Sequence, residues 1–281
     1  MKISAALIAW NEVDTIDLCL KSLKGFVDEV IIADTGSFDG TLEKVEEYLS
    51  RFELNGEVIK VNVKTLGQAR RIALEKATHP WILLIDANLV LSGALKKELL
   101  KTSEVGVISK VRSLNLMGDY IHYFTPLAYH DHHNTLFRKT DIVWGNDLDR
   151  PWPKKPGYKL KSWAVNLSRV RPAWRYWYRG ETFAPESGRE WRTPGNRQLK
   201  WINASKYESL IEYVEAEEGL TFEEVKDIAP NWFLGMLRKF AKPLSPKIKE
   251  QLPETIQVEL KNPRYKLIYK GSELVGRHPS L

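Results

Sequence analysis

The chain has 281 residues, 43% of them hydrophobic and 28% charged, a composition that excludes disordered and fibrous classes and allows one large α/β domain with or without an appendage. Its single cysteine, Cys19, excludes an intramolecular disulfide framework and suits a reducing compartment. The formal net charge of +6 comes entirely from residues 101–281, which carry 30 Lys+Arg and 21 Asp+Glu, against 12 and 15 in residues 1–100.

The first residues, "MKISAALIAWNEVD", begin like a signal peptide, with one lysine and an apolar run. The run is too short for a signal peptide and continues into the acidic "NEVDTID", so it predicts a first strand instead. No stretch of the sequence is apolar over the length that a bilayer requires. We therefore expect a cytoplasmic protein, with the inner membrane surface as the other location.

The first hundred residues alternate between strand and helix patterns. Apolar or β-branched runs predict strands at 2–9, 28–34, 56–63 and 81–87. Apolar residues at helical spacing predict helices at 14–23, with Asp14 as its cap, 40–50 and 67–77. Strands that alternate with helices indicate βαβ units, so the fold class is α/β with a mostly parallel sheet flanked by helices. Right-handed crossovers then place the strand ends at 9–12, 33–37 and 86–88 on one edge of the sheet.

After residue 104 the patterns are weaker. A strand is predicted at 104–114, a mixed segment with a strand-like piece at 130–149, helices at 205–226 and 231–244, and a strand or hairpin at 264–271. Residues 138–201 combine 15 basic with 6 acidic side chains. Seven of the ten tryptophans lie there: Trp144, Trp152, Trp163, Trp174, Trp177, Trp191 and Trp201. Such a surface attracts phosphate-rich partners, and the alternative is a solvated basic face over buried tryptophans.

The stretch "WILLIDANLV" (81–90) places Asp86 at the end of a buried strand and Asn88 two residues later. Two oxygen ligands at this spacing can hold a hard divalent cation, which in turn binds a diphosphate. The alternative is that Asp86 caps the turn that follows.

The other strand ends carry further polar residues. Asp34 precedes the turn "TGSFDGT" (35–41), in which Gly36 and Gly40 allow a ligand to approach closely. Its carboxylate could accept bonds from a base N–H or from ribose hydroxyls, and Arg70 could contact a phosphate. Taken alone, each of these residues is also compatible with a turn or a surface charge.

The order of three segments resembles the family-2 glycosyltransferases with the GT-A fold. These segments are "ALIAWNEVDTIDLCLKSL", "DEVIIADTGSFDGT" and "GQARRIALEKATHPWILLIDAN". The family pattern has an Asn-Glu after the first strand, a "VDDGSTDGT"-like turn, an "ARN" helix and a "DAD" motif. The similarity covers roughly residues 1–95 and continues less securely through "LFRKTDIVWGNDLD" (136–149).

The resemblance implies inverting transfer of a sugar from a nucleoside diphosphate sugar, a UDP-sugar above all, with Mn²⁺ or Mg²⁺ as cofactor. By position, the resemblance implies that a nucleotide pocket is lined by Trp10, Asn11 and Glu12. It implies that Asp34 contacts the base or ribose and that Arg70 supports the nucleotide or its phosphates. It also implies that the metal is held by Asp86 and Asn88. Thr35, Arg71 and Asn88 depart from the pattern, and Asn88 puts the metal dependence in doubt.

Inversion requires a base that removes the proton of the acceptor hydroxyl. The resemblance implies a carboxylate late in the second half, and the candidates are Asp147 and Asp149, of which Asp147 is preferred. The alternative is a solvated polar turn. In the cluster "YHDHHN" (129–134), His130, His132 and His133 are candidates for a further metal ligand, and His132 is the one selected, although the spacing fits no zinc motif. The alternative is a loop that contacts phosphate or sugar.

The acceptor is open between two classes. Arginines interleave with aromatic residues in "RVRPAWRYWYRGETF" (169–183), which suits either an anionic polymer or sugar rings. Either an envelope saccharide or glycolipid, or a hydroxylated base in DNA, therefore fits. Residues 231–249 could form a basic amphipathic helix on a membrane, although an ordinary packed helix is favoured.

The expected organisation is a nucleotide-sugar-binding half (1–104), an acceptor-binding and catalytic-base half (105–204) and a C-terminal helical extension (205–281). The competing class is a non-catalytic GT-A-like module that binds nucleic acid or saccharide.

Overall fold

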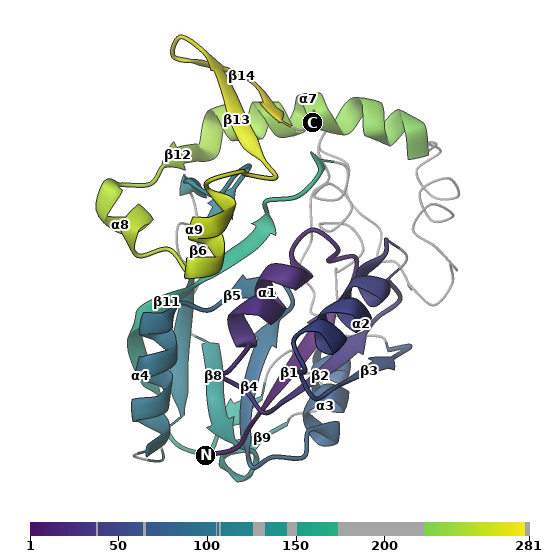
Figure 1. The fold of residues 1–281 in the computed structure, drawn as a ribbon, viewed down its shortest axis with the longest axis vertical. Coiled ribbons are helices and arrows are strands. Elements are labelled where there is room, and N and C mark those ends of the chain that lie inside the picture. Colours follow the sequence, from purple (N-terminus) through teal and green to yellow (C-terminus); the bar gives the residue numbers. More distant parts are fainter. Residues whose placement is uncertain are drawn as a thin grey trace.

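The computed structural model describes residues 1–37, 39–63, 66–104, 106, 108–125, 133–144, 151–173 and 222–278 (Figure 1). The first hundred residues form alternating strands and helices: β1 Ile3–Ala9, α1 Ile16–Leu23, β2 Glu29–Asp34, α2 Thr41–Arg51, β3 Gly56–Lys60, α3 Leu66–Lys76, β4 Trp81–Asp86, β5 Leu89–Val90 and α4 Gly93–Glu104. The α/β class predicted from the sequence is therefore confirmed. The helix α4 was not predicted.

The later part of the chain adds strands first and helices afterwards. Its elements are β6 Ser109–Met117, β7 His122–Phe124, β8 His133–Arg138, the 3-10 helix η2 Lys139–Asp141, β9 Ile142–Val143, β10 Trp152–Pro153, β11 Tyr158–Arg169, α7 Phe222–Phe240, β12 Ala241–Pro243, α8 Pro246–Glu250, α9 Glu254–Glu259, β13 Lys266–Lys270 and β14 Glu273–His278. The last two strands form the hairpin that the sequence allowed.

One ten-stranded sheet organises these elements, in the order β12-β7-β6-β8-β4-β1-β2-β3, with β11 paired to β6 and β5 paired to β11. The strands β3, β2, β1 and β4 are parallel, and β8 is antiparallel to both β4 and β6. The strand β6 consequently runs in the same direction as β1. The carboxyl ends of β1, β2, β4 and β6 therefore share one edge of the sheet, which we call the rim.

Both faces of the sheet are covered, which explains why the strands are apolar on both sides. Residues Ile3, Ala5, Leu7 and Ala9 of β1 contribute to the core beneath α1, α2 and α4, whereas Ala6 belongs to the core beneath α3. The alternation follows directly from the two-residue period of a strand.

A third hydrophobic cluster joins the C-terminal segment to the rest of the molecule. It combines Leu18 of α1 and Val90 of β5 with Leu252, Ile256 and Tyr265 from the end of the chain. The strand β12 also pairs with β7 at the edge of the main sheet. The extension predicted to be helical thus contributes strands as well, and it packs on the α1 side of the sheet (Figure 1).

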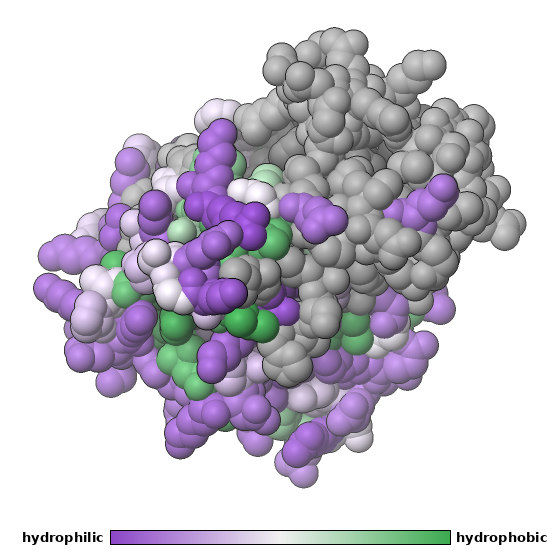
Figure 2. Space-filling view, turned by 90° about the horizontal axis from the view of Figure 1, so that it is seen from above, coloured by the Kyte–Doolittle hydropathy of each residue, from purple (hydrophilic) through white to green (hydrophobic). Residues whose placement is uncertain are grey.

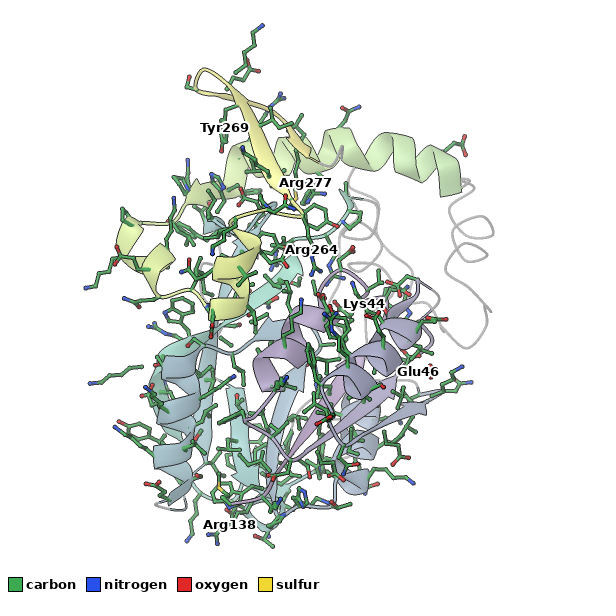
Figure 3. All side chains as sticks on the ribbon, in the orientation of Figure 1. Lys44, Glu46, Arg138, Arg264, Tyr269 and Arg277 are labelled. Atoms are coloured by element: carbon green, nitrogen blue, oxygen red, sulfur yellow. The ribbon has the colours of Figure 1, made fainter. Side chains whose placement is uncertain are left out.

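The C-terminal hairpin is anchored on the turn between β6 and β7. The hydroxyl of Tyr269 lies 3.1 Å from Nε2 of His122, and Arg277 donates to the carbonyl of Gly118 at 3.3 Å. Figure 3 shows Tyr269 and Arg277 on this hairpin. Gly118 has a φ of +80°, and a Cβ there would lie 2.5 Å from the side chain of Leu237. The position therefore requires glycine both for its backbone and for space.

Two local expectations are corrected. Helix α1 begins at Ile16 with Thr15 as its N-cap, so Asp14 does not cap it. A single helix over 231–249 is also wrong, because α7 ends at Phe240 and residues 241–243 pair with β7. Cross-strand pairing overrides helical periodicity there, and the prolines at 243 and 246 prevent the helix from continuing.

Among the coloured residues of Figure 2, seen from above, hydrophilic side chains predominate, with small hydrophobic patches between them. Within the ranges that the structure describes, no helix is long and apolar enough to cross a membrane.

Candidate functional site

Asp34 and Asp86 lie on either side of the last residues of β1. In the strand register, Asp34 is the partner of Ala9 and Asp86 is the partner of Ile8. Both acidic residues therefore stand at the rim, as parallel strands of matched length require.

Arg70 joins them from α3. Its Nη2 donates to Oδ1 of Asp86 at 2.9 Å, and the Arg70 side chain is 5% exposed whereas that of Asp86 is 23% exposed. The buried guanidinium and the partly exposed carboxylate compensate each other's charge, and the ion pair fixes both side chains at the rim. The structure thus brings together Arg70 and Asp86, two residues that the sequence placed on separate elements.

Asp34 organises the turn that follows β2. Its Oδ2 accepts bonds from the backbone N–H groups of Gly36 and Ser37, both at 3.0 Å. The hydroxyl of Ser37 donates to Asp34 Oδ1 and accepts the backbone N–H of Asn11 at 2.9 Å. Asn11 has a φ of 51°, a left-handed conformation that asparagine tolerates better than most residues. The turn of Asp34 is therefore tied directly to the loop after β1.

Glu12 is the centre of a buried polar network, which we call the Glu12 network and which consists of Glu12, Thr15, Asn88 and Arg171. Oε2 of Glu12 accepts from Thr15 Oγ1 at 2.6 Å and from Arg171 Nη2 at 2.7 Å. Oε1 accepts from Asn88 Nδ2 at 3.2 Å. Glu12 is 4% exposed and Arg171 is 1% exposed. The positive guanidinium compensates the buried carboxylate, which would otherwise be costly to desolvate.

The loop after β1 is also held by α2. The backbone N–H of Glu12 donates to Thr41 Oγ1 at 2.7 Å, and that of Val13 donates to Asp39 Oδ2 at 3.2 Å. The ammonium of Lys44 donates to the carbonyl of Val13 at 2.6 Å. Residues 11–13 are therefore fixed by side chains from both neighbouring segments.

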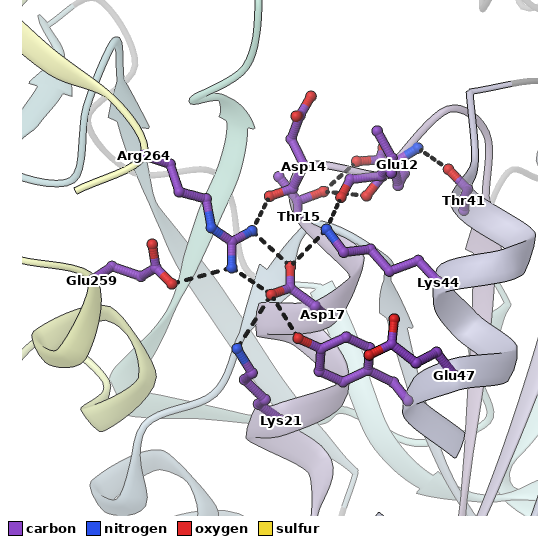
Figure 4. A network of polar contacts seen from close by, with 12 residues as sticks. Glu12, Asp14, Thr15, Asp17, Lys21, Thr41, Lys44, Glu47, Glu259 and Arg264 are labelled. Atoms are coloured by element: carbon purple, nitrogen blue, oxygen red, sulfur yellow. Dashed lines mark hydrogen bonds and ion pairs between the residues drawn. The ribbon is translucent and has the colours of Figure 1, made fainter. Parts of the chain in front are cut away.

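A second ionic cluster, the Asp17 cluster, connects the C-terminal segment to α1 (Figure 4). Both Nη atoms of Arg264 donate to the carboxylate of Asp17, and Nη1 also donates to the carbonyl of Asp14 at 3.0 Å. Burial alone would raise the pKa of the Asp17 carboxyl, but Arg264, with Lys44 and Lys21, holds that pKa below its ordinary value. In Figure 3, Arg264 and Lys44 approach each other between the extension and α2.

The residues predicted to hold a metal fit it only in part. Asp86 offers a partly exposed carboxylate that is paired with Arg70. Asn88 is 1% exposed, and its amide nitrogen is directed at Glu12. No group of three or more His, Cys, Asp or Glu side chains suited to a metal ion occurs among the residues that the structure describes. A metal ion held by Asp86 and Asn88 therefore stays a prediction.

Several predicted residues lie outside the described ranges. They are the two candidate bases, Asp147 and Asp149, and the candidate ligand His132. The residues on either side of the two aspartates form β9 and β10, an antiparallel pair in which Val143 faces Trp152. Of the arginine- and aromatic-rich segment 169–183, residues 169–173 are described.

Arg171 is the main residue that the sequence did not identify correctly. It was grouped with the arginines that could face an acceptor, whereas its side chain is buried against Glu12, 159 positions away. Thr15 and Thr41 were not singled out at all. A hydroxyl three residues after Glu12 was a local signal for Thr15, but no local signal pointed to the partner of Arg171.

Comparison with known proteins finds similarity in the part of the chain that forms this rim. Residues 4–111 match the model of Glycosyl transferase family 2. The SPbeta prophage-derived glycosyltransferase SunS of Bacillus subtilis (strain 168) is 29% identical over 129 residues, which are 46% of this chain and 29% of that protein. The lipopolysaccharide core biosynthesis glycosyltransferase LpsC of Rhizobium meliloti (strain 1021) is 33% identical over 111 residues, 37% of this chain and 39% of that protein.

Among solved structures, TarS 1-349 of S. aureus in complex with UDP-GlcNAc matches 42% of this chain and 34% of that chain, with 27% identity and a TM-score of 0.33. The chain spans less than half the length of both curated relatives. Residues 4–111, which carry the rim from Trp10 to Asn88, are therefore the part of the chain that is similar to Glycosyl transferase family 2, and the chain has the α/β architecture predicted from its sequence.

Proposed function

We propose that this protein transfers a sugar from a nucleoside diphosphate sugar to an acceptor hydroxyl, with inversion at the anomeric carbon. The observation that supports the proposal most is the convergence of Asp34, Arg70 and Asp86 at the end of β1, within the segment that matches the family. Ligands of open α/β sheets bind at this edge, where the strands end.

The proposed donor is a UDP-sugar. Asp34 and the loop of Trp10, Asn11 and Glu12 would receive the nucleoside, and the guanidinium of Arg70 would face the diphosphate. A positive charge there stabilises the negative charge that develops on the leaving diphosphate. A divalent cation, Mn²⁺ or Mg²⁺, would supply further charge neutralisation, with Asp86 as the ligand that the described residues offer.

The proposed reaction is a single displacement. A carboxylate, Asp147 or Asp149, takes the proton of the acceptor hydroxyl. At the same time, the oxygen of that hydroxyl bonds to the anomeric carbon. The bond from that carbon to the diphosphate oxygen breaks, and the nucleoside diphosphate leaves with the electron pair.

The proposed acceptor is a saccharide or glycolipid. The name of LpsC, a lipopolysaccharide core biosynthesis enzyme, supports this class. The excess of basic residues between 138 and 201 also suits an anionic acceptor. DNA that carries a hydroxylated base is anionic too, because of its phosphates. A membrane-surface location, at the cytoplasmic face, would bring the enzyme to a glycolipid.

The experiment that tests the proposal is a panel of nucleotide sugars, measured first by thermal shift and then by release of free nucleotide with and without Mn²⁺. A ligand that binds only the native state raises the melting temperature. We expect one UDP-sugar to do so and to be hydrolysed slowly without acceptor. If no nucleotide sugar binds, the protein is instead a non-catalytic module.

Retention of duplex DNA, measured across a salt series, separates the two acceptor classes. Sequence-independent attraction to phosphates disappears at moderate salt, because it depends on the release of counterions. We expect the retention of duplex DNA by this protein to be lost at moderate salt in this way. Sugar transfer to hydroxylated DNA would instead establish the nucleic-acid acceptor.

A further inference from the structure

We propose that Asn88 and Arg171 are positioning residues that hold Glu12, and that Asn88 acts through Glu12 rather than as a ligand of a metal ion. The inference rests on the proposed function, because Glu12 belongs to the loop that would receive the nucleotide. It also assigns a reason for the amide at position 88, where the family pattern has an acid.

In the Asn88–Glu12 contact, the amide is the donor and the carboxylate is the acceptor. Glu12 accepts bonds from three side chains, one of them the guanidinium of Arg171, as an ionised carboxylate does. A side chain that faces Oε1 of Glu12 must therefore donate a hydrogen bond. The amide nitrogen of Asn88 does so at 3.2 Å, whereas an aspartate there would place two carboxylates in contact within a buried site.

The backbone of Asn88 is bound to β11. Its carbonyl accepts the N–H of Leu167 at 3.0 Å, and the next residue, Leu89, pairs with Asn166 of β11. Asn88 is thus fixed on the β11 side by its main chain and on the Glu12 side by its amide. At 1% exposure, its side chain is turned away from the solvent from which a hydrated metal would arrive.

Arg171 completes the Glu12 network from the segment that directly follows β11. It stands two residues beyond the end of β11 at Arg169, so the strand that contacts Asn88 also delivers the guanidinium to Glu12. The Glu12 network consequently joins the first hundred residues to the later half of the chain. A shift of β11 would be transmitted to the loop after β1 through two contacts to one carboxylate.

The loop after β1 transmits this order to the rest of the rim. The residue before Glu12, Asn11, donates its backbone N–H to Ser37, whose hydroxyl donates to Asp34. Displacing Glu12 would therefore disturb both the loop and the turn of Asp34. We expect loss of the network to weaken nucleotide binding even where no contact with the nucleotide itself is removed.

The test is a double-substitution cycle with Asn88→Asp, Glu12→Gln and the two combined. Asn88→Asp should lower the melting temperature by about 4 to 8 °C and weaken UDP binding on the order of tenfold. The combined variant should recover most of both losses, because the amide introduced by Glu12→Gln can donate to the new carboxylate. Asn166→Asp is the matched control, since Asn166 accepts the N–H of Ser168 at 2.8 Å and a carboxylate accepts equally well.

Titration with Mn²⁺ alone, followed by calorimetry, separates the positioning role from a ligand role. We expect Asn88→Asp to bind Mn²⁺ no more tightly than the wild type does. The inference is overturned if Asn88→Asp keeps its melting temperature and binds Mn²⁺ more tightly, or if the shifts of the two single variants simply add in the combined one.

Two further variants keep the test decisive if Asn88→Asp fails to fold. Asn88→Ser removes the donor without adding charge, and its effect should be smaller in the Glu12→Gln background than in the wild type. Arg171→Met should likewise be less damaging when Glu12→Gln is present, because no buried carboxylate is then left without its cation. Equal losses in both backgrounds would refute the network.

Failure of the inference and failure of the proposed function can be told apart. If the wild type binds no nucleotide sugar, the proposed function fails, while the cycle of melting temperatures still measures the coupling between Glu12 and Asn88. If nucleotide binding is present and the cycle is additive, only the positioning role fails.

Discussion

At the scale of single residues, the rim is built from charges that compensate one another. Arg70 is paired with Asp86, and Arg171 with Glu12, in both cases with the guanidinium more than nine-tenths buried. A buried ion pair contributes little net stability, but removing one partner leaves an uncompensated charge. Substitutions at the rim must therefore be chosen to keep shape while changing charge, so that lost activity is not confused with unfolding.

Asp86→Asn should reduce sugar transfer by about a hundredfold while the protein remains folded. The amide keeps an oxygen that can accept from Arg70, but it removes the negative charge that we assign to donor binding. Steady-state transfer rates and the melting temperature would be measured together. Glu75→Gln is the control, because it breaks the exposed pair of Glu75 with Arg71 on the same helix, and full activity of Asp86→Asn would exclude this residue from the site.

Asp147→Asn should lower kcat by about a hundredfold or more, with little change in the donor KM, because it removes the general base and leaves donor contacts alone. Asp149→Asn is its natural control, two positions away in the same segment. Transfer kinetics at saturating acceptor would measure both. The assignment of the base moves to Asp149 if that variant shows the loss and Asp147→Asn does not.

At the scale of elements, the loops at the rim are positioned by segments that lie far away in the sequence. The start of α2 binds the loop after β1, and the Asp17 cluster ties α1 to the segment between α9 and β13. Arg264 also donates to the carbonyl of Asp14, which closes the same loop from the C-terminal side. The extension is therefore part of the support of the candidate site.

Arg264→Met should lower the free energy of unfolding at pH 7 by about 3 kcal/mol, because Asp17 is left buried with the more distant ammonium groups of Lys44 and Lys21 as its cations among the described residues. In the folded wild type the pKa of Asp17 lies below its ordinary value of 3.8, so the ionised carboxylate stabilises the fold above that pH. This contribution is lost as the pH falls through the lowered pKa. The difference between wild type and variant should therefore shrink in acid.

Urea unfolding at several pH values would measure this difference. Arg51→Met is the control, since Arg51 and Glu47 are both well exposed and 4.0 Å apart, and such a pair contributes little. A difference between wild type and Arg264→Met that stays constant from neutral to strongly acidic pH would contradict the proposed role of Asp17.

At the scale of the whole molecule, the described residues form one main sheet and three hydrophobic clusters that connect segments far apart in the sequence. The sheet runs from β3 to β12, and the cluster around Leu18 and Ile256 joins α1 to α9. The main sheet crosses the boundary expected near residue 104, because β8 pairs with β4. The boundary expected near residue 204 lies outside the described residues and stays a prediction. Burial shared between distant segments favours a single cooperative transition.

Ile256→Ala should destabilise the protein by about 3 kcal/mol, because Ile256 is fully buried where the extension meets α1. Hydrogen exchange would show whether amides in β1 and β4 lose protection together with those in α9. Val258→Ala on the same helix is the control, since Val258 is 60% exposed. Lost protection confined to the extension would mean that it unfolds independently of the sheet.

The amino-acid sequence by itself determined the α/β class, the strands and most helices of the first hundred residues, and the position of Asp34 and Asp86 at one edge. These features follow from local periodicity and from the rule that parallel strands end on the same side. Helix α4 was missed, and the helix expected over 231–249 ends at Phe240, because pairing between β12 and β7 is not visible in local periodicity.

Only the tertiary structure decided what Glu12, Asn88 and Arg171 contact. Arg171 looked like a surface cation among aromatic residues, but the path of β11 buries it against a carboxylate 159 positions earlier. Asn88 looked like a weakened ligand, but in the fold its amide nitrogen donates to Glu12. Charge and spacing fix which contacts a side chain can make, whereas the folded backbone selects the partner, because the cost of burying a charge is met only where an opposite charge is brought to it.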